Sequence, residues 1–132
     1  MADLTVEPDT GSSHDPLLRV HQEARGGAVV VRVVGDVDLA TAPALDAHLC
    51  RAQEQLTPPT PLVLDLTGVE FLASAGLSEL IKHSQRCATI GSRLIVVAAH
   101  RPVLRAMEVT GLTDTIAVVA SVDDALTIAA AD

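Results

Sequence analysis

The sequence predicts an α/β fold, in which one domain contains a mixed, mostly parallel sheet of about five strands and about four helices. Short aliphatic runs alternate with segments whose apolar residues recur at helical spacing, and Gly or Pro separates many of them. This alternation is typical of parallel strands joined by helical crossovers. The chain has 132 residues, the length of one ordinary domain, and 48% of them are hydrophobic. The core must be aliphatic, because the chain has no Trp, no Tyr and a single Phe, Phe71.

The first two strands are expected at 17–24 and 28–34, as a hairpin. Gly26 and Gly27 lie between them, and both can adopt the positive φ of a tight turn. The second strand is nearly continuous valine, interrupted only by Arg32, which predicts a central strand covered on both faces. The hairpin supplies the one antiparallel pair of the expected sheet.

A first helix is expected after Thr41, whose hydroxyl is a candidate N-cap, with Pro43 in the first turn. Its apolar residues recur at the spacing of one helix face, and they are Leu45, Leu49, Ala52 and Leu56. The proline-rich segment 57–61 ends this helix. The third strand is expected directly afterwards, at 62–66.

The second helix is expected after the loop 67–75 and ends at Gly91. Its predicted apolar stripe consists of Leu77, Leu80, Ile81, Ser84 and Ala88. Ser121 and Asp124 resemble a capping box and mark the start of the last helix. The elements expected between these two helices are a strand at 93–98, a helix from Pro102 to Gly111 and a strand at 115–120.

The charge is unevenly distributed along the chain. There are 17 acidic and 9 basic residues, for a net charge of −8. Four of the acids lie within 1–16, which contains no Lys or Arg. Residues 1–16 are therefore expected to form an acidic flexible tail, followed by one folded domain at 17–130.

The composition disfavours several partners. An acidic protein repels phosphates, and one aromatic residue cannot build a stacking platform for bases, so no nucleic acid is expected. No apolar run is long enough to span a membrane, and the N-terminus lacks the basic start and apolar run of a signal peptide. These features predict a cytoplasmic protein that does not bind membranes.

Motifs of catalysis, cofactor binding and metal binding are missing. The sequence has no glycine-rich phosphate loop and no G-x-S-x-G elbow, and its five histidines are scattered. Cys50 and Cys87 lie 37 residues apart, which is not a metal-ligand spacing. They are expected to be free thiols in a reducing cell, with a redox-sensing pair as the alternative. We therefore expect no enzyme activity, no cofactor and no metal.

Two loops that follow predicted strands are the candidate functional segments, since ligand sites in open α/β sheets gather at strand ends. The first, 35–39, is Gly-Asp-Val-Asp-Leu and places two carboxylates before a helix. The second, 65–77, ends in Ala-Ser-Ala-Gly at a helix start. Taken singly, the acids suit a turn and the helix dipole, and Ser74 suits an N-cap.

Together these segments resemble the two signatures of STAS domains, the family of anti-sigma factor antagonists and sulfate-transporter tails. Residues 35–45 resemble G-[ED]-[LIV]-D-x-x-[TS]-A-x-x-L, and 65–77 resemble D-[LF]-[ST]-x-V-x-F-[ILM]-D-S-[ST]-G-L. The resemblance covers about 17–130. It implies a bacterial antagonist that binds a kinase-fold anti-sigma factor and so releases a sigma factor for transcription. The residues it places at the partner surface are Asp36, Asp38, Thr67, Ser74, Ala75, Gly76 and Leu77.

The sequence departs from the family pattern where the family is regulated. In such antagonists the kinase phosphorylates a Ser or Thr at the start of the helix after the second motif, which breaks the complex. This chain has Ala75 at that position and Ala73 in place of the preceding acid. Because Ala75 has no hydroxyl, phosphorylation at the standard position is excluded.

Three forms of control remain open. The protein is constitutive or is controlled through its partner, or Cys50 and Cys87 form a redox pair, or another hydroxyl is phosphorylated. Ser74, Thr67 and Ser78 are the candidates for such phosphorylation, which adds up to about two negative charges.

Two other functions stay open as alternatives. One is an accessory subunit of a lipid transporter or of a signalling scaffold, because STAS domains occur in both. The other is a small-ligand-binding module that uses the crevice between the two loops. In each case Phe71 is expected to pack beneath the second loop, so that Phe71→Ala would cost about 3–5 kcal/mol.

Overall fold

The structure, a computed structural model, describes residues 17–131. The expected acidic tail at 1–16 lies outside these residues. The described elements follow the predicted order and are β2 (Leu18–Arg25), β3 (Ala28–Gly35), α1 (Ala42–Glu54), β4 (Leu62–Gly68), α2 (Ser74–Thr89), β5 (Leu94–Val97), α3 (Arg101–Val109), a 3-10 turn η1 (Leu112–Asp114), β6 (Ala117–Val119) and α4 (Val122–Ala131). The 3-10 turn was not predicted from the sequence.

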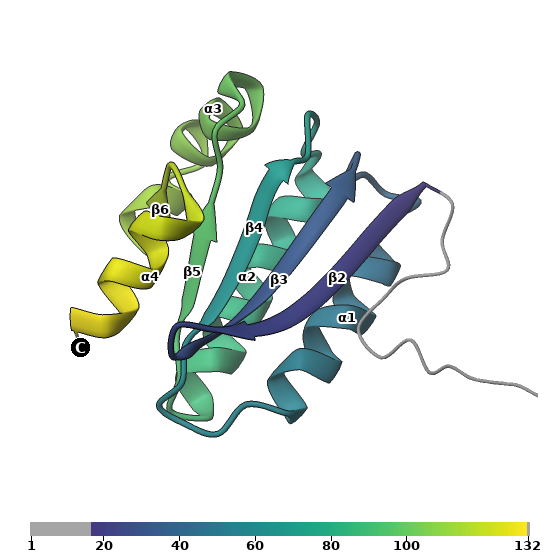
Figure 1. Ribbon diagram of the computed structural model, residues 1–132. Coiled ribbons are helices and arrows are strands. Elements are labelled where there is room, and N and C mark those ends of the chain that lie inside the picture. The colour runs from purple at the N-terminus through teal and green to yellow at the C-terminus, as the bar shows by residue number, and fades with distance from the viewer. Residues whose placement is uncertain (1–16, 132) are drawn as a thin grey trace, which may run out of the picture.

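The five strands form one sheet in the order β2-β3-β4-β5-β6 (Figure 1). β2 pairs with β3 in antiparallel fashion, and the other three pairings are parallel. This arrangement confirms the predicted mixed, mostly parallel sheet. No helix within 17–131 is long and apolar enough to cross a membrane.

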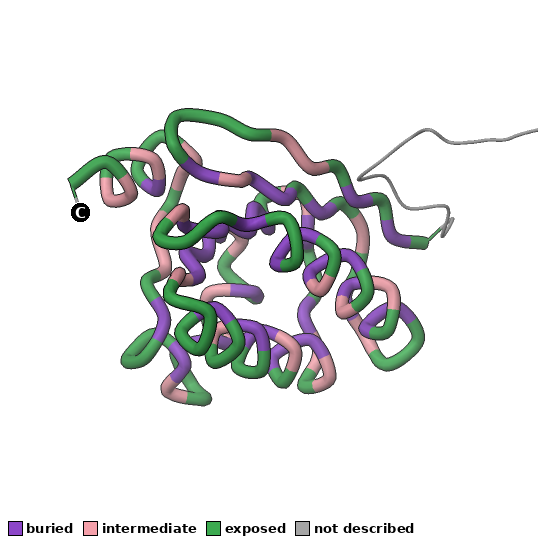
Figure 2. The backbone as a smooth tube through the Cα atoms, turned by 90° about the horizontal axis from the view of Figure 1, so that it is seen from below, coloured by how far each residue is buried: buried purple, intermediate pink, exposed green. Residues whose placement is uncertain are grey.

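Helices cover the two faces of the sheet unequally. The larger core contains the buried apolar residues of α1, α2 and α3 together with one face of the strands. The smaller core lies on the other face, where α4 is the only helix within 17–131 that packs against β3, β4 and β5. Figure 2 shows the result, with buried residues along the strands and alternating buried and exposed positions around the helices.

The β2–β3 hairpin turns where the sequence predicts it. Gly26 and Gly27 have φ of 57° and 80°, so both adopt the left-handed conformation of a tight turn. The prediction that β3 is covered on both faces holds only for its first half. Arg32 and Val34 are exposed, because α4 covers just the part of that face around Ala28 and Val30.

The predicted stripe of α1 is confirmed for Leu45, Leu49 and Ala52, whereas Leu56 is buried beyond the end of the helix. The predicted stripe of α2 is partly wrong. Leu77 and Leu80 are buried as expected, whereas Ile81 is 44% exposed and Ala88 is also exposed. The remaining buried positions of α2 are Gly76, His83 and Cys87. The difference arises because α2 packs against α1 as well as the sheet, and a polar side chain can be buried there if a partner satisfies it.

The C-terminal helix begins as predicted. The Ser121 hydroxyl accepts a hydrogen bond from the Asp124 N–H at 3.0 Å, which satisfies one of the free amides of the first turn. This contact is the expected half of a capping box, and it anchors the only helix on its face among the described residues.

Phe71 does not pack beneath its loop, and that prediction is wrong. Its side chain is 51% exposed. The neighbouring Leu72 and Val69 are buried instead, so aliphatic residues fill the space under the loop and the ring is left at the surface.

We expect Phe71→Ala to lower the free energy of unfolding by only about 1 kcal/mol, since half of the ring's burial is missing. Leu80→Ala is the control, because Leu80 is fully buried and its truncation should cost about 2–5 kcal/mol. Urea denaturation followed by circular dichroism measures both, as the chain has no Trp or Tyr. A loss of 3 kcal/mol or more for Phe71→Ala would show that the ring is buried.

Gly76 is required where α2 crosses the two loops. A Cβ on this residue would lie 2.5 Å from Leu72 Cδ1 and 2.7 Å from Val37 Cγ1. Both neighbours are buried and cannot move freely.

We therefore expect Gly76→Ala to destabilise the protein by about 1–3 kcal/mol, although Ala normally improves a helix by about 1 kcal/mol over Gly. Ser78→Ala, at an exposed position of the same helix, should change stability by less than about 0.5 kcal/mol. The same denaturation experiment compares them, and a Gly76→Ala protein as stable as the wild type would contradict this packing.

Candidate partner-binding site

The fold brings the two motif loops together at one end of the sheet. β3 and β4 are parallel neighbours, so the loops that follow them leave the same edge (Figure 1). The Val37 N–H donates to the Phe71 carbonyl at 2.9 Å, and the Ala73 N–H donates to the Val37 carbonyl at 2.8 Å. These bonds form a parallel bridge between Val37 and Leu72. The two loops are thus one surface.

The first loop is held by its own polar groups. Asp38 Oδ1 accepts hydrogen bonds from the backbone N–H groups of Ala40 and Thr41, at 2.9 and 3.1 Å. The Thr41 hydroxyl donates to the Asp36 carbonyl at 2.8 Å and accepts from the Asp38 N–H at 3.0 Å. Thr41 occupies the N-cap position of α1, but its side chain binds the loop and not the helix. Asp36 is exposed and Asp38 is half-buried.

The second loop starts from a buried carboxylate. Asp65 Oδ1 accepts hydrogen bonds from the Thr67 N–H at 2.9 Å and from its hydroxyl at 2.7 Å. Asp65 Oδ2 lies 3.1 Å from Arg32 Nε and accepts its hydrogen bond. Thr67 is exposed, but its hydroxyl is occupied by Asp65.

At the start of α2, the structure separates the predicted site residues into two groups. Ala73 is the N-cap, in an extended conformation, and Ser74 is the first helical residue, so Ser74 is not the N-cap. Ser74 is exposed and Ala75 is half-buried, whereas Gly76 and Leu77 are buried. Only Ser74 and part of Ala75 are therefore accessible, and the next two residues support them from below.

Sequence reasoning missed an apolar groove beside this helix start. The groove has a volume of about 440 Å³ and is lined by Phe71, Leu72, Leu77, Pro102, Arg105, Ala106, Val109 and Thr110. Phe71 and Val109, which are 51% and 77% exposed, are large apolar side chains open to solvent. One signal was present in the sequence, since the single aromatic residue of the chain, Phe71, lies in the second motif.

The two cysteines lie away from this surface, on α1 and α2, and both are free. Cys87 is fully buried. Cys50 is partly exposed, and its Sγ lies 3.2 Å from Arg86 Nη1. Burial raises the pKa of both thiols, which favours the unreactive protonated form. Redox control through this pair remains a prediction.

Known proteins are similar to this chain in both sequence and fold. Residues 19–125 match the STAS domain family. The chain is 35% identical to the anti-sigma-F factor antagonist RsfB of Mycobacterium tuberculosis over 101 residues, 76% of this chain and 80% of RsfB. It is 27% identical to the anti-sigma-F factor antagonist RsfA of the same species over 99 residues, 75% of this chain and 77% of RsfA.

The crystal structure of an anti-sigma factor antagonist from Mycobacterium paratuberculosis is similar to this fold with a TM-score of 0.78 and 35% sequence identity. The match covers 89% of this chain and 97% of that one. With the two signature motifs joined at one end of the sheet, these similarities confirm the resemblance seen in the sequence. The chain belongs to the STAS domain family.

Proposed function

We propose that this protein is an anti-sigma factor antagonist, which acts in the cytoplasm by binding a kinase-fold anti-sigma factor and so releases a sigma factor. The observation that carries the proposal is the bridge between Val37 and Leu72, which joins both motifs into one surface at the start of α2. The names of the curated relatives support the same role. The protein works by binding and not by catalysis.

The motif residues that are exposed or half-buried at the proposed interface are Asp36, Asp38, Thr67, Ser74 and Ala75. Asp36 is exposed and can offer its carboxylate to a basic side chain of the partner. Asp38 contributes mainly through the shape of the first loop, because its Oδ1 already accepts hydrogen bonds from the loop backbone. Gly76 and Leu77 position the helix start from below.

The groove lined by Phe71 and Val109 extends the interface to α3. It shares Leu72 and Leu77 with the second motif, so a partner seated on the helix start also reaches the groove. Aromatic side chains that become buried on binding supply much of the energy of protein interfaces. We therefore assign the groove to the same anti-sigma factor.

In this proposal, Ala75 prevents the phosphorylation that usually breaks the complex with the anti-sigma factor. The side chain at the standard phospho-acceptor position has no hydroxyl, so control is constitutive or resides in the partner, or it uses another group. Ser74 and Ser78 are exposed on α2, whereas the Thr67 hydroxyl is bound to Asp65. The redox pair Cys50–Cys87 is the remaining route.

We expect Ala75→Glu to weaken binding to the anti-sigma factor by about tenfold or more, equal to about 1.4 kcal/mol, because it adds charge and bulk at the helix start. Isothermal calorimetry with the purified partner measures this. Gln85→Glu adds the same charge on the same helix about 15 Å away and should leave the affinity unchanged. If Ala75→Glu also binds normally, the start of α2 is not the interface.

Phe71→Ala is expected to lower the affinity about fivefold or more, the loss of roughly 1 kcal/mol typical of an interface anchor, with little loss of stability. Ile81→Ala is the control, since Ile81 is an exposed apolar side chain that does not line the groove. Equal affinities for both variants and the wild type would exclude the groove from the interface.

Affinity capture from a native lysate, with and without reductant, identifies the partner by mass spectrometry. Recovery of a kinase-fold anti-sigma factor supports the proposal. Recovery of an ATP-binding cassette protein in its place would favour an accessory role in a lipid transporter. The same peptides report phosphorylation at Ser74 and any disulfide between the cysteines.

A further inference from the structure

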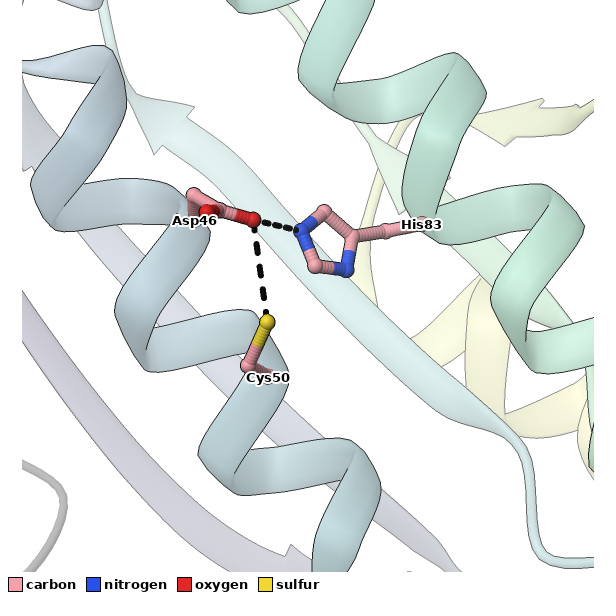
Figure 3. Close-up of side chains that lie close together, drawn as sticks. All are labelled: Asp46, Cys50 and His83. Carbon is pink, nitrogen blue, oxygen red and sulfur yellow. Dashed lines mark hydrogen bonds and ion pairs between the residues drawn. The ribbon is translucent and has the colours of Figure 1, made fainter.

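α1 and α2 lie side by side, and a cluster of potential ligand atoms occupies the space between them (Figure 3). Asp46 and Cys50 are one turn apart on α1, and His83 comes from α2. Asp46 Oδ1 lies 2.8 Å from His83 Nε2 and 3.7 Å from Cys50 Sγ. The three ligand atoms all lie within 4.8 Å of one another.

Gln53 fixes the tautomer of His83. The Gln53 amide nitrogen donates to the His83 carbonyl at 3.0 Å, which places the amide oxygen of Gln53 2.9 Å from His83 Nδ1. An amide oxygen only accepts, so Nδ1 carries the proton and donates it. The neutral imidazole then presents a lone pair at Nε2.

This lone pair faces oxygen atoms that also only accept. Asp46 Oδ1 lies 2.8 Å from His83 Nε2, and Glu79 Oε1 lies 3.5 Å from it. Two acceptors at hydrogen-bond distance repel unless a positive charge lies between them.

Glu79 adds a fourth potential ligand. Glu79 is one turn before His83 on α2, and its Oε1 is buried. This oxygen is 3.1 Å from Lys82 Nζ, an ion-pair distance, but accepts no hydrogen bond from any residue within 17–131. The Lys82 ammonium compensates the charge of this oxygen in the structure, so Glu79 becomes a potential ligand only when Lys82 turns away.

We propose that Asp46, Cys50 and His83 bind a divalent transition metal of the zinc type between α1 and α2, with the neighbouring Glu79 as the candidate fourth ligand. A thiolate, an imidazole and carboxylates are the ligands that Zn²⁺ prefers, usually in a tetrahedral set of four. A ligating histidine commonly donates its other N–H to a neighbouring acceptor, which is the role of Gln53.

Access and charge are compatible with this site. Lys82 Nζ lies 2.8 Å from Asp46 Oδ1 and marks a position that attracts cations. Its side chain is 46% exposed, so it can turn into solvent when the metal enters. The Cys50 proton leaves as the thiolate binds, which makes the metal affinity fall as the pH falls.

A metal at this position would join two helices that begin at the proposed interface. α1 starts after the first motif loop and α2 starts within the second, so the metal would fix their relative positions. With Glu79 as the fourth ligand the coordination sphere would be closed, which is typical of a structural site.

The test uses the full chain without an affinity tag, freed of metal by a chelator. We expect Zn²⁺ to bind at about one ion per chain in calorimetry and to raise Tm. Co²⁺ should give the absorption of a tetrahedral site with a thiolate ligand. Cys50→Ser and Asp46→Asn should each weaken Zn²⁺ binding by about 100-fold or more, the upper end of losses caused even by supporting residues.

His21→Ala, at an exposed histidine on β2, and Asp123→Asn, at an exposed carboxylate on α4, are the controls, because both residues lie outside the ligand set. Both should retain Zn²⁺ affinity and the Co²⁺ spectrum. The partly exposed positions of Cys50 and Asp46 allow their variants to fold, which circular dichroism verifies.

Two results would overturn the proposal. One is Zn²⁺ binding that Cys50→Ser and Asp46→Asn do not weaken. The other is an absence of binding together with ¹⁵N chemical shifts that show both ring nitrogens of His83 protonated at neutral pH. In that case a proton, and not a metal, separates the facing acceptors.

Discussion

The backbone bridge between Val37 and Leu72 is the constraint on which the functional surface depends. It extends the parallel pairing of β3 and β4 beyond the ends of both strands. The loops therefore cannot move independently, and α2 must begin directly above them. Gly76 makes this close approach possible, because any larger side chain would meet Leu72 and Val37. The close packing at Gly76, the shape of the two loops and the exposed start of α2 all follow from this bridge.

Some side chains of the two loops stabilise the loop backbone, and others are exposed to a partner. Asp65, Thr67, Asp38 and Thr41 satisfy the backbone of the loops or each other. Such hydrogen bonds hold irregular backbone in one conformation, which reduces the entropy lost on binding. Several motif residues that the sequence suggests as partner contacts therefore stabilise the loops. The exposed Phe71 lies in the second loop and remains available to a partner.

The interface between α1 and α2 also contains polar groups that satisfy each other and polar groups that are left available to a ligand. His83 is fully buried on the face of α2 that also buries Leu80 and Cys87. Gln53 makes that burial tolerable by pairing with Nδ1, but it leaves Nε2 facing two carboxylates. The metal ion proposed at this position would complete the polar network. Its signal in the sequence was faint, consisting of two i, i+4 pairs on separate helices.

The sequence alone determined the order of elements, the hairpin, the helix limits at Gly91 and Gly111 and the two motif loops. Periodicity, turn residues and caps are local, so they can be recognised without coordinates. Tertiary structure decided which face of α2 is buried, that Phe71 is exposed beside α3, and that Asp46, Cys50 and His83 meet. These outcomes depend on the positions of helices that are far apart in the chain, and no local pattern fixes how two such helices rotate against each other.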